Sequence, residues 1–154
     1  DFKRQKRYRL MWMDTKYESG TVKVVAYNEK GDAVAEKEIH TAGKPDHIEL
    51  VADRNEIKAD GKDLSFVTVR VVDKEGNLCP DAQHLIKYAV KGAGTYRAGA
   101  NGDPTSLELF HVPQMKVFNG MMTAVVQSTD KPGEITLTAT GKGLKSGRLV
   151  LISK

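Results

Sequence analysis

The sequence predicts an all-β protein: an immunoglobulin-like β-sandwich preceded by a partial second β-domain. Apolar residues alternate with polar ones along many short segments, as Ile135, Leu137 and Ala139 do with the threonines between them. Turn-forming glycine, proline and asparagine residues separate these segments at short intervals. No segment shows an amphipathic helical pattern longer than about one turn. Many short strands with frequent turns are typical of a sandwich.

The N-terminal part is predicted to be the end of a separate domain. Its predicted strands are 7–14, 20–27 and 33–40. Tyr8, Leu10 and Trp12 share one face of the first strand, which indicates a place in a core rather than a sugar-stacking platform. Three strands cannot bury two faces. Residues 1–42 are therefore predicted to be the C-terminal strands of a truncated β-sandwich domain.

Residues 46–154 are predicted to form the immunoglobulin-like β-sandwich domain. Gly43 and Pro45 punctuate a short polar link ahead of it. Within it, Val67 and Val69 alternate with polar residues, as in a half-buried strand. The predicted strands are 46–52, 64–72, 84–91, 106–111, 120–127, 134–140 and 147–153. About seven strands in a segment of this length fit the immunoglobulin fold.

The net charge of +4 comes from the N-terminus. Residues 1–9 carry an excess of lysine and arginine, and the rest of the chain has equal numbers of basic and acidic residues. A nucleic-acid binder spreads its basic residues over a folded face, so no nucleic-acid partner is expected. No apolar run approaches the ~20 residues that a membrane helix needs, so no membrane contact is expected. The chain has neither an initiator methionine nor a signal peptide, and we expect a soluble piece of a longer protein.

Neither a cofactor nor a metal ion is expected. Cys79 is the single cysteine, so it cannot form a disulfide within the chain, and it is interpreted as a half-buried small residue. The histidines lie far apart in the sequence. Several aspartates accompany turns without the Asp-x-Asp-x-Asp-Gly spacing of a calcium loop, and turn formation is their simpler role. They are Asp53, Asp60, Asp63, Asp73, Asp81 and Asp103.

The glycine-rich segment 92–110 is predicted to form a loop at one end of the sandwich. The short side chains of Asn101 and Asp103 are expected to bond nearby backbone and order it, while Glu108 begins the next strand. The segment contains no nucleophile with a neighbouring base. Its predicted role is contact with a neighbouring domain, and contact with a glycan is the alternative. The candidate site residues are Asn101, Gly102, Asp103, Pro104 and Glu108.

Several motifs resemble the C-terminal domains of glycoside hydrolase family 2 enzymes. Residues 8–27, with a tryptophan strand, a turn at Gly20 and a strand that ends in Ala-Tyr, are similar to the β-domain that follows the catalytic barrel in β-galactosidase-like enzymes of Bacteroides-type bacteria. Ser19 stands where that family usually has proline. The next domain is similar to the C-terminal immunoglobulin-like domain of the same enzymes. Its matching segments are 41–43, 52–54, 57–67 and 99–104.

This resemblance implies that the parent protein is a β-galactosidase-like glycosidase of the retaining type, which uses two glutamates on a (β/α)₈ barrel. No position of this chain matches the motifs that carry those glutamates. The chain is therefore interpreted as a non-catalytic accessory part, with the remaining domains of the parent enzyme as partners and no catalytic residue. The resemblance also implies a periplasmic or extracellular location. A homodimer through the N-terminal unit is a further possible partnership.

Two other functions fit an isolated sandwich of this kind. The first is a bacterial surface immunoglobulin-like module of an adhesin or stalk. The second is a stand-alone carbohydrate-binding module. A catalytic barrel upstream distinguishes the accessory function from the adhesin, which has tandem copies of residues 45–154 instead. Binding of glycans to the chain alone distinguishes the carbohydrate-binding module.

Overall fold

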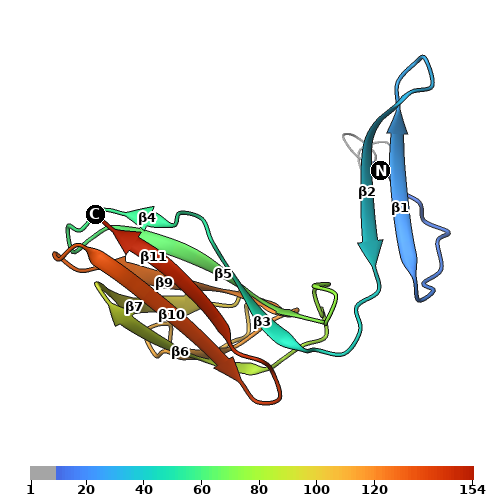
Figure 1. Cartoon of the computed structure of the whole chain (residues 1–154). Coiled ribbons are helices and arrows are strands. Elements are labelled where there is room, and N and C mark those ends of the chain that lie inside the picture. Colours follow the sequence, from blue (N-terminus) through green and yellow to red (C-terminus); the bar gives the residue numbers. More distant parts are fainter. Residues whose placement is uncertain (1–9) are drawn as a thin grey trace. The chain divides into compact units, whose positions relative to one another are not determined.

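The structure is a computed structural model that describes residues 10–154, and it divides into two compact units (Figure 1). The first unit is Asp1–Thr41 and the second is Ala42–Lys154. Strands are the regular elements of the described residues, which confirms the all-β fold class. Within this described part, no helix is long and apolar enough to cross a bilayer.

The first unit contains an antiparallel hairpin of strands β1 (Thr21–Tyr27) and β2 (Ala33–His40). Asn28 builds the turn between them. Its side-chain oxygen accepts hydrogen bonds from the backbone N–H groups of Lys30 and Asp32, each at 2.9 Å. Asparagine commonly stabilises turns by bonding the backbone two residues ahead in this way.

The strand register gives this hairpin one apolar face and one charged face. Val22 lies opposite Ile39 on the apolar face, and both side chains are more than half exposed. Lys23 belongs to the other face, where its ammonium group lies 2.9 Å from the carboxylate of Glu36. The alternation of apolar and charged residues therefore places the side chains as in a half-buried sheet. The apolar face nevertheless has no covering layer within the described part of this unit.

Trp12 does not lie in a core, contrary to the prediction. Its side chain is 62% exposed, because a single two-stranded ribbon offers no second layer to cover it. The predicted strand 7–14 falls partly outside the described residues. Its described part, residues 10–14, forms no strand.

The second unit is a sandwich of two sheets whose strands are mostly antiparallel (Figure 1). The strands of the first sheet, in spatial order, are β4 (Glu56–Ile57), β11 (Gly147–Ser153), β10 (Gly133–Gly141), β6 (Leu85–Gly92) and β8 (Gln114–Lys116). Those of the second sheet are β3 (His47–Ala52), β5 (Leu64–Val72), β9 (Met121–Ser128) and β7 (Gly94–Ala100). Within these sheets the short pairing of β4 with β11 is parallel.

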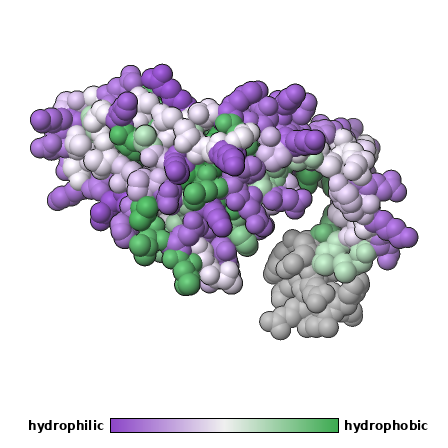
Figure 2. Space-filling view, turned by 90° about the horizontal axis from the view of Figure 1, so that it is seen from below, coloured by the Kyte–Doolittle hydropathy of each residue, from purple (hydrophilic) through white to green (hydrophobic). Residues whose placement is uncertain are grey.

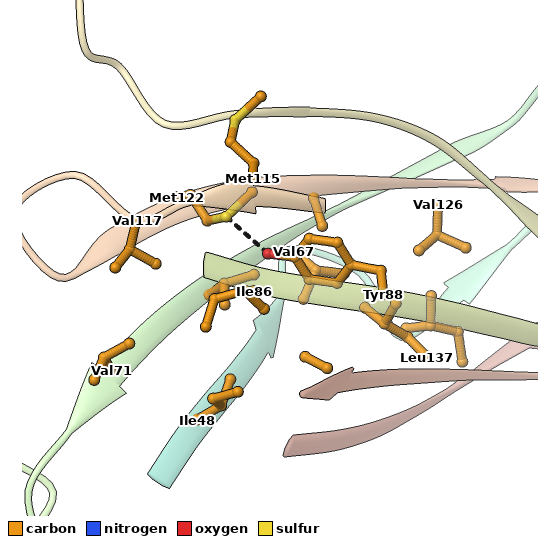
Figure 3. Close-up of a cluster of buried hydrophobic side chains, with 14 of the residues drawn as sticks. Ile48, Val67, Val71, Ile86, Tyr88, Met115, Val117, Met122, Val126 and Leu137 are labelled. Atoms are coloured by element: carbon orange, nitrogen blue, oxygen red, sulfur yellow. Dashed lines mark hydrogen bonds between the residues drawn. The ribbon is translucent and has the colours of Figure 1, made fainter. Parts of the chain in front are cut away.

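Alternate residues of both sheets build the core of the sandwich (Figure 3). Val67 and Val69 of β5 are completely buried, as are Ile86 of β6 and Leu137 of β10. Burying an aliphatic side chain of this size contributes roughly 1.5–3 kcal/mol of transfer free energy. The period-two alternation read from the sequence thus identifies the residues that join the two sheets.

The predicted strands differ from the structure mainly between β6 and β9. The predicted strand 106–111 is wrong, because these residues form a loop. The predicted loop 92–110 is partly wrong, because residues 94–100 form β7. Gly94 is needed there for close packing, since a Cβ atom would lie 2.8 Å from the side chain of Ile135. Glycine content indicated a loop where the structure has a tightly packed strand.

Candidate functional site

The loop of residues 101–113, which joins β7 to β8, is the candidate site. It begins with Asn101, whose side-chain oxygen accepts a hydrogen bond from the backbone N–H of Asp103 at 3.0 Å. Gly102 lies between them with a φ of +76°, in the left-handed region that glycine adopts readily. Asn101 and Gly102 therefore form a compact turn, and Pro104 follows with a ring that restricts its own φ.

Asp103 forms a second turn directly after the first. Its carboxylate accepts hydrogen bonds from the backbone N–H of Thr105 at 2.8 Å and from the Thr105 hydroxyl at 2.7 Å. These two bonds lower the pKa of Asp103 below its ordinary value. The expectation that Asn101 and Asp103 order the loop by bonding nearby backbone agrees with this geometry.

Strand β8 holds the loop from the other side through Lys116. The Asn101 amide donates a hydrogen bond to the carbonyl oxygen of Lys116 at 3.0 Å. The carboxylate of Glu108 accepts a hydrogen bond from the backbone N–H of the same residue, at 3.2 Å for each oxygen. Glu108 was predicted to begin a strand, which is wrong, since it lies within the loop and caps the edge of β8.

The end of the loop is fixed to β7 at Phe110. Its carbonyl oxygen accepts a hydrogen bond from the backbone N–H of Gly99 at 2.8 Å and one from the Tyr96 hydroxyl at 3.4 Å. A Cβ atom on Gly99 would lie only 2.6 Å from that hydroxyl, so glycine makes room for the tyrosine. A bulge in β7 between Tyr96 and Ala98 shifts the register.

Tyr96 connects the loop to the core. Its ring stacks on that of Tyr88, with centroids 5.5 Å apart and the ring planes 12° from parallel. Tyr88 in turn directs its hydroxyl toward the sulfur of Met122 at 2.7 Å, the contact drawn as a dashed line in Figure 3. Burial raises the pKa of both tyrosines. The loop therefore rests on an aromatic pair in which Tyr88 is buried and Tyr96 is partly buried.

Three apolar side chains of the loop face solvent. Leu107 is 95% exposed, Leu109 is 61% exposed and Phe110 is 62% exposed. Figure 2 shows hydrophobic groups, in green, that stand out from the largely hydrophilic surface of the second unit. Sequence reasoning assigned these residues to the predicted strand 106–111 and so missed them as an exposed surface. The available signal was the adjacent turn-rich segment 101–106, because its asparagine, glycine, aspartate and proline favour a loop over a strand.

Two of the aspartates that suggested calcium, Asp60 and Asp63, serve as turn and loop anchors. Asp60 accepts hydrogen bonds from two backbone N–H groups, those of Lys62 at 2.9 Å and Asp63 at 2.8 Å. Asp63 accepts one from Lys58 at 2.8 Å and is 3.0 Å from the Arg54 guanidinium, which together lower its pKa to about 2. Over the described residues, no three histidine, cysteine or acidic side chains are placed to hold a metal ion.

Cys79 is buried, and it is not an exposed or activated thiol. Its side chain is 4% exposed, and its sulfur lies 3.7 Å from the carbonyl oxygen of Gly43. Burial, with a smaller contribution from the Asp73 carboxylate, raises the pKa of this thiol. A reactive cysteine needs the opposite environment, partly exposed and electropositive.

A shallow hollow of about 540 Å³ lies where the turn after β9 meets the end of β6. The Thr129 hydroxyl forms hydrogen bonds with backbone groups of two residues that line this hollow. This hydroxyl bonds the carbonyl oxygen of Ala93 at 3.2 Å and accepts a bond from the Lys131 N–H at 3.3 Å. The turn thus uses its polar groups to hold its own shape.

Comparison with protein families identifies the second unit. A family model described as glycoside hydrolase family 2 C-terminal domain 5 matches residues 48–150. The chain belongs to this family. A second model, a domain of unknown function termed DUF4982, matches residues 1–35. The resemblance read from the sequence is therefore confirmed, and the candidate loop lies inside the family 2 C-terminal domain.

Known relatives of this C-terminal domain are longer proteins. A β-galactosidase from Bacteroides ovatus is 52% identical over 134 residues, which cover 87% of this chain and 16% of the relative. A β-glucuronidase from Formosa agariphila is 28% identical over 89% of this chain and 14% of its own length. The crystal structure of a glycosyl hydrolase family 2 member from Bacteroides cellulosilyticus matches with a TM-score of 0.84 and 35% identity, over 91% of this chain and 18% of that one. The chain spans about a sixth of the length of these relatives.

Proposed function

We propose that the chain is a non-catalytic C-terminal accessory region of a family 2 β-glycosidase, β-galactosidase-like in its parent activity. In this role the sandwich supports the architecture of the enzyme and contacts its other domains. The catalytic carboxylates belong to another part of the parent polypeptide. The periplasm or the cell exterior is the proposed location.

One observation carries this proposal. Similar regions occur in a protein named β-galactosidase and in one named β-glucuronidase, and in each the match covers about a sixth of the length or less. A region shared by enzymes with different sugars in their names is suited to support an architecture rather than to select a substrate.

The carboxylates of the described residues support the same proposal. A retaining glycosidase needs one carboxylic acid with a raised pKa, which protonates the leaving oxygen, beside a second carboxylate. Hydrogen bonds lower the pKa of several aspartates here instead, and they do so by binding the fold's own N–H and side-chain groups. These aspartates are Asp46, Asp60, Asp63, Asp73 and Asp103.

The test is hydrolysis of aryl β-galactosides and aryl β-glucuronides by the purified chain, with the Bacteroides ovatus β-galactosidase as a positive control. We expect no turnover above the buffer rate. Turnover that disappears when a single aspartate or glutamate of this chain is replaced would refute the proposal. Turnover that survives every such replacement identifies a contaminating enzyme, and further purification to a constant specific rate then decides the result.

The apolar face of the hairpin in the first unit favours a second partnership. Val22 and Ile39 are exposed there, and a two-stranded ribbon needs a covering layer. The proposed layer is the preceding part of the same β-domain in the parent polypeptide. A homodimer through this unit is the competing arrangement, and sedimentation of the chain over a range of concentrations distinguishes the two.

A further inference from the structure

We infer that the loop between β7 and β8 is a docking surface for the rest of the parent glycosidase polypeptide, with Leu107, Leu109 and Phe110 as its apolar contacts. The inference rests on the proposed accessory function and adds to it the surface and the partner.

The first argument is the exposure of these three side chains. Large aliphatic and aromatic residues are normally among the most buried, and single exposed ones need no explanation. Here three of them lie within four consecutive positions, and Leu107 is almost fully exposed. The backbone N–H of Val112 donates a hydrogen bond to the carbonyl oxygen of Leu109 at 3.3 Å, so the segment turns back while its side chains stay outside.

The second argument is that the loop is held in place before any partner arrives. Asn101 and Glu108 attach it to Lys116 of β8, and the carbonyl oxygen of Phe110 attaches it to Gly99 and Tyr96 of β7. A surface whose backbone is already ordered loses little conformational entropy when it binds. Apolar side chains on such a rigid support are suited to fit a complementary surface.

The polar groups of the loop argue against a sugar ligand. Sugar recognition requires amide and carboxylate groups that are free to bond hydroxyls beside an aromatic face. The carboxylates of Asp103 and Glu108 and the amide of Asn101 already bond the loop and strand β8. What the loop presents outward is mainly hydrocarbon.

The size of the surface indicates a partner on the same polypeptide. Three side chains of this size offer on the order of 400 Å², which is about half of the roughly 800 Å² per partner that a stable complex buries. A covalently linked domain needs less area, because the linkage replaces most of the association entropy by a high effective concentration. The chain covers 16% and 18% of two relatives, so more than four-fifths of each polypeptide lies outside it.

The experiment measures the accessibility of the loop with and without the rest of an enzyme. Leu107→Cys is introduced into the isolated chain and into a chimera, in which this chain replaces the corresponding region of the Bacteroides ovatus β-galactosidase. A water-soluble maleimide labels both, and mass spectrometry reads the labelling rate for each peptide. We expect the cysteine at position 107 to react at least tenfold more slowly in the chimera. Leu109→Cys provides an independent second position.

Lys142→Cys is the matched control, because its exposed side chain lies in the turn between β10 and β11 of the same unit. Its labelling rate is expected to be the same in both proteins. Equal rates for positions 107 and 109 in the two proteins overturn the inference. A labelling rate in the isolated chain that rises on dilution also overturns it, because the loop then contacts a second copy of the chain. A labelling rate that galacto-oligosaccharides lower overturns it as well, because the loop then binds a glycan.

These readouts are independent of the proposed function. Failure of the accessory function appears as hydrolysis by the isolated chain, whereas failure of the docking surface appears as unchanged labelling in a chimera that still folds. Circular dichroism and the thermal midpoint of each variant establish folding before any rate is compared. A substitution that unfolds the chain is replaced by the other loop position, so that one of the two always gives a decisive rate.

Discussion

The carboxylate of Asp73 accepts a hydrogen bond from the backbone N–H of Gly43, 30 residues earlier in the chain, at 2.7 Å. The same side chain accepts hydrogen bonds from the N–H of Glu75 at 3.0 Å and from the N–H of Asn77 at 2.8 Å. Asp73 is 1% exposed. It therefore orders its own hairpin turn and fastens the first residues of the second unit to that turn.

Replacement of this carboxylate should destabilise the second unit. Asp73→Asn keeps the size of the side chain but leaves one acceptor oxygen in place of two, so that part of the buried N–H groups lose their partners. We expect a clearly lower thermal midpoint by circular dichroism. Glu75→Gln is the matched control, since it removes the same charge from an exposed side chain of the same turn. Equal midpoints for the two variants would contradict the anchoring role.

Stability should depend on pH through Asp63 and Asp73. Hydrogen bonds lower the pKa of each to about 2 from an ordinary value of 3.8. A lowered pKa means that the carboxylate binds a proton less tightly in the folded chain than in the unfolded chain, so the charged form stabilises the fold. Their contribution is therefore complete above about pH 4 and is lost as the pH falls toward 2.

Urea unfolding between pH 2 and pH 7 measures this dependence. The free energy of unfolding should be nearly constant near neutral pH and should fall below about pH 4. Asp73→Asn should show a smaller acid-induced loss, because one of the two groups no longer titrates. A variant with the same acid-induced loss as the parent chain argues against a lowered pKa for Asp73.

Glycines at positions 92 and 102 should differ in their tolerance of alanine. Both have a positive φ, of +92° and +76°. A Cβ atom at Gly92 would overlap the carbonyl oxygen of Glu134, whereas one at Gly102 meets nothing within 4 Å. Gly102→Ala should cost only the backbone strain, about 1–2 kcal/mol, and Gly92→Ala should cost more than about 3 kcal/mol. Equal losses in urea unfolding would show that packing around Gly92 adjusts.

The turn at Asp103 should protect the loop from proteolysis. Asp103→Ala removes the acceptor of two bonds from Thr105, so the segment that carries Leu107 and Phe110 should open more often. Thermolysin, which cleaves before large apolar residues, should cut there about tenfold faster, with little change in the thermal midpoint. Asp130→Ala, in an exposed turn elsewhere, serves as the control. No change in the cleavage rate would mean that the remaining bonds suffice to hold the loop.

The first unit should exchange its amide hydrogens faster than the sandwich. Among the strands of residues 10–154, β1 pairs with β2 alone, and this ribbon is mostly exposed. Strand β10, in contrast, lies between β6 and β11. A two-stranded ribbon is marginally stable in water. Native-state exchange of the monomer should therefore show low protection for residues 21–27 and high protection for residues 133–141. Equal protection would indicate that another surface covers the hairpin.

Much of the sandwich could be predicted because alternation has a direct physical cause. Strand side chains point to opposite faces in turn, so Val67 and Val69 identify both a strand and its buried side. The bounds 64–72 and 147–153 agree with the structure for this reason. The all-β class, the family and the ordering role of Asn101 and Asp103 also follow from local pattern and local chemistry.

The remaining features depend on contacts between distant residues. Gly94 and Gly99 predict a loop when they are read locally. In the structure, the side chains of Ile135 and Tyr96 occupy the space that a side chain at these two positions would fill. Leu107 and Phe110 have the apolar character of a strand, yet the loop's attachment to Lys116 and Gly99 turns them toward solvent. Composition and alternation determine which residues prefer burial. The space and hydrogen bonds available after the sheets assemble decide which of them are buried.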